Sequence, residues 1–370
     1  MADIKNCDYK KIAVIMAGGN NVMLWPKATE KYPKQFLSLL SNESMVEATY
    51  NRLLPFFEPE HIFIVTSEES AQLIKQQIPL LQDENIIIEP FAKHTAPCLA
   101  LTLSVLKEKY DGDTIMMAFP SDHHISNVRE FHNSLDIAGR VAACTQDIVT
   151  IGIHPTRPAT KYGYVQIKNE KGDLGELYDY EVRKSATFAE KPDVETAKRF
   201  LSSGDFLWNS GMFIMSIDRF WRAFEEHLPE HFKLFEIIKK TLNKDIFENA
   251  VREAYMQMES VSMDYAILEK DSDVYVVISS FNWSDLGDLD EIYRLSRKDG
   301  RNNVLLGDVV AFGVKNSMIM TDERLIGIAG VEDLIVVDTK EALLICKKGQ
   351  SERVQDIVDF LRRKQINHYL

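Results

Sequence analysis

An aspartate that follows an apolar run is the first residue whose setting suggests chemistry on phosphate groups. Asp122 lies in the segment FPSDHHI (119–125), directly after a run typical of a buried strand. A hard divalent ion bound together with substrate phosphates usually takes one or two carboxylates as ligands. Asp122 is therefore a candidate metal ligand, although an aspartate that caps a helix or closes a turn fits the same pattern. A second aspartate, Asp285, stands in the glycine-containing turn WSDLG (283–287).

Two lysines and an asparagine have equally suggestive neighbours. Lys34 follows a proline between apolar residues in YPKQFL (32–37), so its ammonium group is held in a defined place and could meet a phosphate. Lys191 follows Glu190 in FAEKP (188–192), a pairing that offers a carboxylate to hydroxyl groups and a cation to a phosphate. Asn209, in WNSGMF (208–213), carries both a donor and an acceptor, which suits hydroxyl recognition. Surface lysines, solvated ion pairs and an ordinary turn explain each of these segments taken alone.

A loop rich in small and polar residues follows the first apolar run of the chain. It begins with Ala17, Gly18 and Gly19, and glycines there let the backbone approach a ligand and present N–H groups to phosphate or base. The loop matches neither the GxGxxG pattern of dinucleotide-binding proteins nor a Walker loop. The missing GxGxxG removes the main support for a Rossmann-type dehydrogenase, and a tight turn from strand to helix remains the simple alternative.

The spacing of apolar residues predicts an open α/β sheet that positions these side chains. Runs typical of buried strands lie at 12–16, 62–66, 86–88 and 114–119; helices are expected after a capping box at 44–47, over 68–77, and over 95–110 with Thr95 as its cap. Alternating strands and helices favour parallel βαβ units. Ligands of such sheets bind beyond the carboxyl ends of the strands, where the loops after Met16 and Phe119 must lie.

The pattern changes near residues 290–302, where polar residues and a glycine mark a boundary. Short β-type runs follow at 304–306, 309–314, 317–320, 334–337 and 342–346 without helices between them, and residues 350–363 form an amphipathic helix. We therefore expect a first domain over residues 1–295 and a small C-terminal β domain with a closing helix over residues 296–370.

Composition excludes several classes of protein. The 370 residues are 45% hydrophobic and 27% charged, as in ordinary globular proteins, and the net charge of −13 comes without a basic stripe, which argues against a nucleic-acid partner. No run approaches the ~20 apolar residues of a membrane span, and the polar N-terminus is not a signal peptide. The four cysteines include no CxxC pair, so we expect reduced thiols, no zinc site, no disulfide framework and a cytoplasmic location.

Taken in order, these segments resemble the signature set of the bacterial GDP-mannose pyrophosphorylases, or mannose-1-phosphate guanylyltransferases, of the short single-function type. The resemblance runs from about residue 11 to residue 361. It rests on LWP and YPKQFL, PSDHHI, GIHPTRPATKYGYVQI, FAEKPD, WNSGMF, SMDYAILEK, WSDLGD and EDLIVVDTKEALLICKK. It implies a Rossmann-like, mostly parallel α/β nucleotidyltransferase domain followed by a small C-terminal β domain.

The resemblance also implies a reaction. A nucleotidyl group, GMP, passes from GTP to a sugar-1-phosphate, mannose-1-phosphate, and pyrophosphate leaves in line with the help of Mg²⁺. The residues implied for nucleotide binding are Ala17, Gly18, Gly19, Lys27, Lys34, Glu89, Thr95, Pro97, Ser121 and Asp122. Those implied for the sugar are Gly163, Glu190, Lys191, Asn209 and Asp285, with Asp122 and Asp285 as metal ligands and Lys34, Asp122, Lys191 and Asp285 as catalytic groups.

The nucleotide loop departs from the family pattern at two positions. Asn21 and Met23 stand where the family has a glycine and an arginine, and an arginine at the second position would grip the triphosphate. Lys27, one helical turn further on, is a candidate for the missing charge. The alternative function is that of a weak or inactive homologue, which binds a nucleotide sugar and acts as a regulatory or partner-binding subunit. A homodimer is a further expectation that the sequence leaves open.

Overall fold

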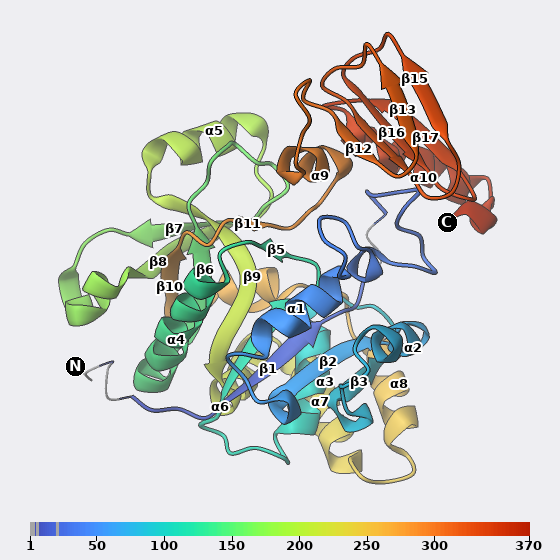
Figure 1. Cartoon of the computed structure of the whole chain (residues 1–370). Coiled ribbons are helices and arrows are strands. Elements are labelled where there is room, and N and C mark those ends of the chain that lie inside the picture. The colour runs from blue at the N-terminus through green and yellow to red at the C-terminus, as the bar shows by residue number, and fades with distance from the viewer. Residues whose placement is uncertain (1–3, 5–6, 20–21) are drawn as a thin grey trace. The chain divides into compact units, whose positions relative to one another are not determined.

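The computed structural model describes residue 4, residues 7–19 and residues 22–370. The chain divides into two compact units, and each is made of several separate segments. The first unit consists of Met1–Gly18, Thr49–Ser121 and Ile125–Trp283, and the second unit of Gly19–Ala48, Asp122–His124 and Ser284–Leu370. Figure 1 labels most of the helices and strands of both units.

The first unit is built on a mixed nine-stranded sheet with the order β3-β2-β1-β4-β9-β6-β10-β8-β7. The strands are β1 (Lys11–Met16), β2 (Ile62–Ser67), β3 (Ile86–Glu89), β4 (Ile115–Pro120), β6 (Ile148–Ile153), β7 (Tyr164–Lys168), β8 (Val182–Ala189), β9 (Phe206–Ser216) and β10 (Val274–Ser279). The first four are parallel to one another, as expected. The long strand β9 then runs antiparallel to both β4 and β6, which the sequence pattern did not reveal.

Helices cover both faces of this sheet, so its central strands, such as β1 and β4, are buried on both sides. Ile12, Val14 and Met16 of β1 share a core with α3 (Thr95–Leu106), α6 (Ile217–His227), α7 (Pro229–Thr241) and α8 (Phe247–Gln257). The alternate residues Ala13 and Ile15 are also fully buried and point to the opposite face. Helix α4 (Val128–Thr145) packs against β4, β6, β9 and β10. The remaining helices in and beside this unit are α1 (Met45–Leu53), α2 (Glu68–Gln77) and α5 (Val194–Ser203).

Two predicted helix starts have different outcomes. The capping box before α1 is confirmed, because the Glu47 N–H donates to Ser44 Oγ and the Ser44 N–H donates to the Glu47 carboxylate, both at 3.3 Å. The prediction that Thr95 caps α3 is wrong. His94 occupies the cap position with φ of 64°, and the Thr95 hydroxyl accepts a hydrogen bond from the Met263 N–H instead.

The C-terminal residues of the second unit form the expected small β domain. Strands β12 (Val304–Leu306), β14 (Met318–Thr321) and β16 (Leu334–Asp338) are parallel, β17 (Leu343–Lys347) is antiparallel to β16, and β13 (Val309–Phe312) is parallel to β15 (Ile326–Ala329). Strand β15 was not among the predicted β-type runs. Helices α9 (Leu289–Leu295) and α10 (Val354–Arg363) flank the strands, and β5 (His124–Ile125) pairs with β11 (Trp283–Ser284).

The core of the second unit also contains residues from the start of the chain. Val22, Leu24, Trp25 and Ala28 pack in one hydrophobic cluster with side chains of β14, β16 and α10. The loop after β1 therefore folds as part of the C-terminal unit. The expected division at residue 295 places this loop in the first domain, whereas in the structure it belongs to the second unit.

The expectation that all four cysteines are reduced thiols is wrong for two of them. Cys7 and Cys144 form a disulfide with their Cα atoms 6.0 Å apart, whereas Cys98 and Cys346 are free. The two bonded residues are 137 positions apart, so no local motif could reveal the pair.

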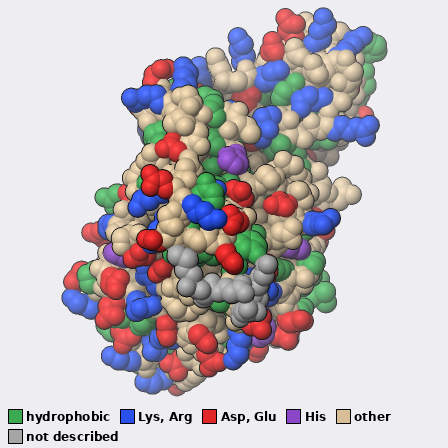
Figure 2. Space-filling view, turned by 90° about the vertical axis from the view of Figure 1, so that its left-hand side faces the viewer, with side chains coloured by type: hydrophobic (Ala, Val, Ile, Leu, Met, Phe, Trp, Pro, Cys, Tyr) green, Lys and Arg blue, Asp and Glu red, His purple; other side chains and the backbone are tan. Residues whose placement is uncertain are grey.

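The lengths of the helices and the distribution of charge can be compared with the expectations from composition. No helix among them is both long enough and apolar enough to cross a bilayer. Figure 2 shows Lys and Arg side chains mixed with Asp and Glu side chains over the face that it presents, without a continuous basic field.

Gly307 provides a test of the small β domain. Its φ is +88°, and a Cβ atom there would lie 2.2 Å from the carbonyl oxygen of Thr321. We expect Gly307→Ala to lower the free energy of unfolding by about 2 kcal/mol or more, because it combines a left-handed alanine with a clash against backbone. Urea unfolding measures the change. Gly300→Ala is the control, since nothing lies within 4 Å of its Cβ position; equal losses in the two variants would contradict this account of Gly307.

Candidate active site

A buried lysine brings both metal-ligand candidates together in the second unit. Lys34 begins a short 3-10 helix directly after Pro33, and the residue is only 1% exposed. Its ammonium group donates to Asp122 Oδ2 at 2.8 Å and, through a second short contact, to the main-chain carbonyl of Asp285. A buried ammonium group needs such partners to offset the loss of water. The predicted residues Lys34, Asp122 and Asp285 thus form one cluster.

The electrostatics of this cluster keep Asp122 ionised. Burial by itself would raise the pKa of Asp122, but the charge and hydrogen bond of Lys34, together with His123, hold that pKa below its usual range. The Asp122 side chain remains 30% exposed. Asp285 directs one carboxylate oxygen to the Gly287 N–H at 3.0 Å. The carboxylate oxygens that Asp122 and Asp285 offer are of the kind that suits a hard divalent cation such as Mg²⁺.

The carboxyl ends of β1 and β4 lie next to each other, as the sequence predicted. The Ala17 N–H donates to the Val65 carbonyl at 2.8 Å, and the Ser121 N–H donates to the Met16 carbonyl at 3.2 Å. The loops that follow these two strands therefore start from neighbouring points of the sheet. Gly19 has φ of +90°, a conformation that glycine adopts without strain. Asn21 lies outside the described residues.

A second buried group faces the start of the nucleotide loop within the first unit. Glu89, at the end of β3, is 5% exposed, and its Oε2 atom lies 3.3 Å from where a side chain on Gly18 would begin. Its Oε1 atom accepts a hydrogen bond from the Tyr255 hydroxyl at 3.1 Å, and that hydroxyl also lies 3.0 Å from the Pro97 carbonyl. Burial raises the pKa of Glu89 to about 7, although hydrogen bonds from Tyr255 and Cys98 oppose the rise.

Four of the five residues expected at the sugar also come together in the first unit, whereas Asp285 belongs to the second unit. A side chain on Gly163 would lie 2.7 Å from Glu190 Oε2 and 3.8 Å from Asn209 Cβ, so only a glycine leaves this space open. The Asn209 amide oxygen accepts from the Gly211 N–H at 3.3 Å and lies 3.1 Å from the Thr150 hydroxyl, which also lies 2.9 Å from the Met212 carbonyl. Lys191 lies 2.8 Å from Glu190 and is 64% exposed. A polar cradle is thus preorganised around Gly163.

Asp264 belongs to this cradle and was missed as a functional residue. Its carboxylate accepts a hydrogen bond from the Asn209 amide at 2.5 Å. Burial and the nearby Glu190 charge raise the pKa of Asp264 to about 6. The residue opens a π-helical turn, Asp264–Leu268, and such turns are frequent at functional sites. Its position in SMDYAILEK was a usable signal, because that segment carried part of the resemblance.

Lys27 and Thr95 have structural partners of their own. Lys27 forms an ion pair with Asp322 in the second unit. Thr95 lies one residue after His94 at the start of α3 and accepts from the Met263 N–H at 2.8 Å. Tyr255, which orients Glu89, stood in no recognised motif and could not have been found from the sequence.

The family model for nucleotidyl transferases matches residues 12–302, and a model for the MannoseP isomerase/GMP-like beta-helix domain matches residues 307–361. The chain belongs to the nucleotidyl transferase family. This membership confirms the predicted α/β class with a C-terminal β domain, and it makes the protein a nucleotidyltransferase. Enzymes of this family use a divalent metal ion, which agrees with the oxygen donors that surround Lys34.

Relatives of this nucleotidyltransferase extend over nearly its whole length. A mannose-1-phosphate guanylyltransferase from Escherichia coli is 35% identical over 363 residues, which cover 97% of this chain and 75% of the relative. An enzyme of the same name from Klebsiella pneumoniae gives the same values. A solved structure described as mannose-1-phosphate geranyltransferase from Thermus thermophilus is 27% identical, with a TM-score of 0.84, and the match covers 95% of this chain and 99% of that one. The predicted resemblance is thereby confirmed.

Glu89 gives the nucleotidyltransferase a measurable pH dependence of stability. The folded state raises the pKa of Glu89 from 4.5 to about 7, so wild-type protein loses unfolding free energy as the pH rises through this range. We expect Glu89→Gln, which cannot ionise, to be more stable than wild type at pH 8 by up to about 3 kcal/mol and to lose this advantage near pH 4. Urea unfolding at several pH values checks the prediction. The exposed Glu253→Gln should follow wild type, and parallel curves for wild type and Glu89→Gln would contradict it.

Proposed function

We propose that this protein transfers GMP from GTP to mannose-1-phosphate and releases GDP-mannose and pyrophosphate, with Mg²⁺ as the metal. The names of the relatives support this choice of substrates. The observation that carries the proposal within the protein is the contact of one buried ammonium group with Asp122 and with the backbone of Asp285. Burying a charge costs free energy, so its presence here favours a working catalytic site over a homologue that has lost activity.

The proposed reaction needs little covalent work from the protein. An oxygen of the sugar phosphate attacks the α-phosphorus of GTP, a new P–O bond forms, and the bond from the α-phosphorus to the bridging oxygen of pyrophosphate breaks. The protein contributes position and charge. When bound by Asp122 and Asp285, Mg²⁺ would neutralise phosphate charge and orient both substrates. The Lys34 ammonium group contacts the Asp122 carboxylate and the Asp285 carbonyl. It thereby holds the two residues near each other and places a positive charge beside them.

The cradle around Gly163 supports the assignment of sugar recognition. The Asn209 oxygen accepts a hydrogen bond from the Gly211 N–H, so the amide orientation is fixed and its nitrogen faces Asp264. We propose that Glu190 and Asn209 bind sugar hydroxyls, and that Lys191 leaves Glu190 to meet the sugar phosphate. The high exposure of Lys191 allows this movement.

Gly18 and Glu89 support the choice of guanine. Guanine presents two adjacent donors, N1–H and the 2-amino group, and a carboxylate can accept both. Glu89 is held in place by Tyr255, and its second oxygen faces the glycine of the nucleotide loop. We propose that Glu89 binds this edge of the base. Ala17, Gly18, Gly19, Thr95, Pro97 and Ser121 complete the proposed nucleotide site.

A non-catalytic role is the weaker alternative. Met23 in place of the expected arginine is its motivation, and none of the comparisons supports it. Met23→Arg should increase turnover if a charge at this position is all that the loop lacks. A homodimer and a cytoplasmic location stay predictions from the sequence.

Pyrophosphate release provides the direct test. With GTP, mannose-1-phosphate and Mg²⁺, we expect wild-type protein to release pyrophosphate and Asp122→Asn to lose about 10²–10³-fold in kcat, because a preorganised charge in the site is removed. Asp111→Asn is the matched control, since Asp111 pairs with Lys10 on the surface. Wild-type protein that binds GTP in calorimetry but releases no pyrophosphate would support the regulatory alternative, and full activity in Asp122→Asn would overturn the role of Asp122.

Base selection can be tested with inosine triphosphate, which lacks the 2-amino group. Wild-type enzyme should prefer GTP over ITP in kcat/KM by about 10-fold or more, since a buried carboxylate loses one hydrogen bond with ITP. Glu89→Gln should reduce this preference, because an amide has only one acceptor oxygen. An unchanged preference in the variant would assign the selection of guanine to other groups.

A further inference from the structure

The nucleotide loop of this protein is anchored by the C-terminal β domain. Leu24 and Ala28 are fully buried, and Trp25 is 7% exposed. All three belong to the cluster that contains Ile335 and Val337 of β16. The loop has turns but no extended helix or strand between Val22 and Pro33, and the Lys27 N–H, for example, donates to the Leu24 carbonyl at 2.9 Å. The apolar contact adds a tertiary anchor to these local hydrogen bonds.

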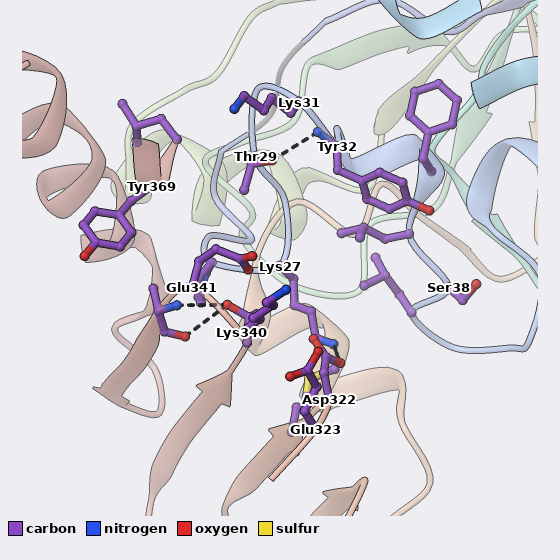
Figure 3. Close-up of a pocket in the computed structure, with 18 of the residues that line it drawn as sticks. Lys27, Thr29, Lys31, Tyr32, Ser38, Asp322, Glu323, Lys340, Glu341 and Tyr369 are labelled. Carbon is purple, nitrogen blue, oxygen red and sulfur yellow. Dashed lines mark hydrogen bonds and ion pairs between the residues drawn. The ribbon is translucent and has the colours of Figure 1, made fainter. Parts of the chain in front are cut away.

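Two polar contacts also join the nucleotide loop to the C-terminal residues of the same unit. The indole N–H of Trp25 donates to the main-chain carbonyl of Tyr369 at 2.7 Å. The ammonium group of Lys27 pairs with Asp322, which directly follows strand β14. Figure 3 shows Lys27 and Asp322 directed toward each other at the wall of a cavity of about 720 Å³, which residues of the loop and of the β domain line together. The pair therefore joins the loop to the domain at one defined point.

The environment of Lys27 separates two explanations of this residue. The Lys27 side chain is 18% exposed and the Asp322 side chain 43% exposed, so the lysine is the more buried partner. If Lys27 replaced the arginine that is absent at Met23, Asp322 would compete with the triphosphate for its charge. If Lys27 anchors the loop, Asp322 would help GTP to bind. The Trp25 contact and the shared core favour anchoring, because they fix the same segment to the same domain.

We propose that Asp322 is a positioning residue for nucleotidyl transfer, which holds Lys27, and with it the segment 22–27, in the conformation that receives GTP. A loop ordered before binding does not lose conformational freedom when the nucleotide arrives, and affinity rises accordingly. The inference rests on the proposed function for its kinetic test. It assigns to the β domain a part in GTP binding, although the nucleotidyl transferase model ends at residue 302.

A double-mutant cycle with pyrophosphate release as the readout tests the proposal. We expect Lys27→Met and Asp322→Asn each to raise the KM for GTP by about fivefold, the upper range for a partly exposed ion pair, with kcat and the KM for mannose-1-phosphate unchanged. The double variant should show about the same fivefold rise rather than the product of the two, because both substitutions break one interaction. Exchange of the charges, Lys27→Asp with Asp322→Lys, should return the KM to within about twofold of wild type.

Glu323→Gln is the matched control for Asp322→Asn. Glu323 is exposed, stands next to Asp322, and undergoes the same loss of one negative charge. It should leave the KM for GTP unchanged. If Asp322→Asn leaves that KM unchanged or lowers it while Lys27→Met raises it, and if the charge exchange does not rescue, then Lys27 meets the triphosphate directly and the proposal is overturned.

Hydrogen exchange gives a readout that does not depend on turnover. Mass spectrometry of peptic peptides should show faster exchange over residues 22–31 in Asp322→Asn than in wild type or Glu323→Gln, without nucleotide present. Equal exchange in all three proteins would overturn the anchor even if the enzyme is active. Faster exchange in a protein that releases no pyrophosphate would support the anchor and place the failure in the proposed function.

Discussion

The burial of the Lys34 ammonium group is the constraint on which the candidate active site depends. A lysine that is 1% exposed has lost most of its hydration, and its partners here are the Asp122 carboxylate and the Asp285 carbonyl. These three residues are far apart in the chain, and each follows or precedes an irregular segment. The requirement to satisfy one cation therefore fixes the geometry of three loops at once. It also keeps Asp122 ionised, which is the state that a metal ligand must have.

The other two clusters follow the same logic of mutual satisfaction. Tyr255 holds one oxygen of Glu89, and the other oxygen is left toward Gly18. The Gly211 N–H holds the oxygen of Asn209, and its nitrogen is left to Asp264. In both cases a hydrogen bond to one polar atom of the side chain fixes the direction of its other polar atom. The raised pKa values of Glu89 and Asp264 are the energetic cost of keeping such groups out of water.

The β domain packs together with the nucleotide loop in the second unit. Its hydrophobic core includes four residues of the nucleotide loop, and the loop in turn carries Lys34. The departures of this chain from the family pattern, at positions 21 and 23, fall within or beside that loop. Trp25 and Lys27, close to these positions, each contact the C-terminal part of the same unit.

The sequence by itself determined the α/β class, the parallel strands β1 to β4, the capping box before α1 and the position of Asp122 at the end of a strand. It could do so because apolar periodicity and turn chemistry are local properties of the chain. Only the tertiary structure decided the reversal of β9, the disulfide between Cys7 and Cys144, the contact of Tyr255 with Glu89 and the partner of Lys27. Each of these joins residues that are distant in the sequence. Which distant groups meet is set by the burial of the whole core, and no local pattern records it.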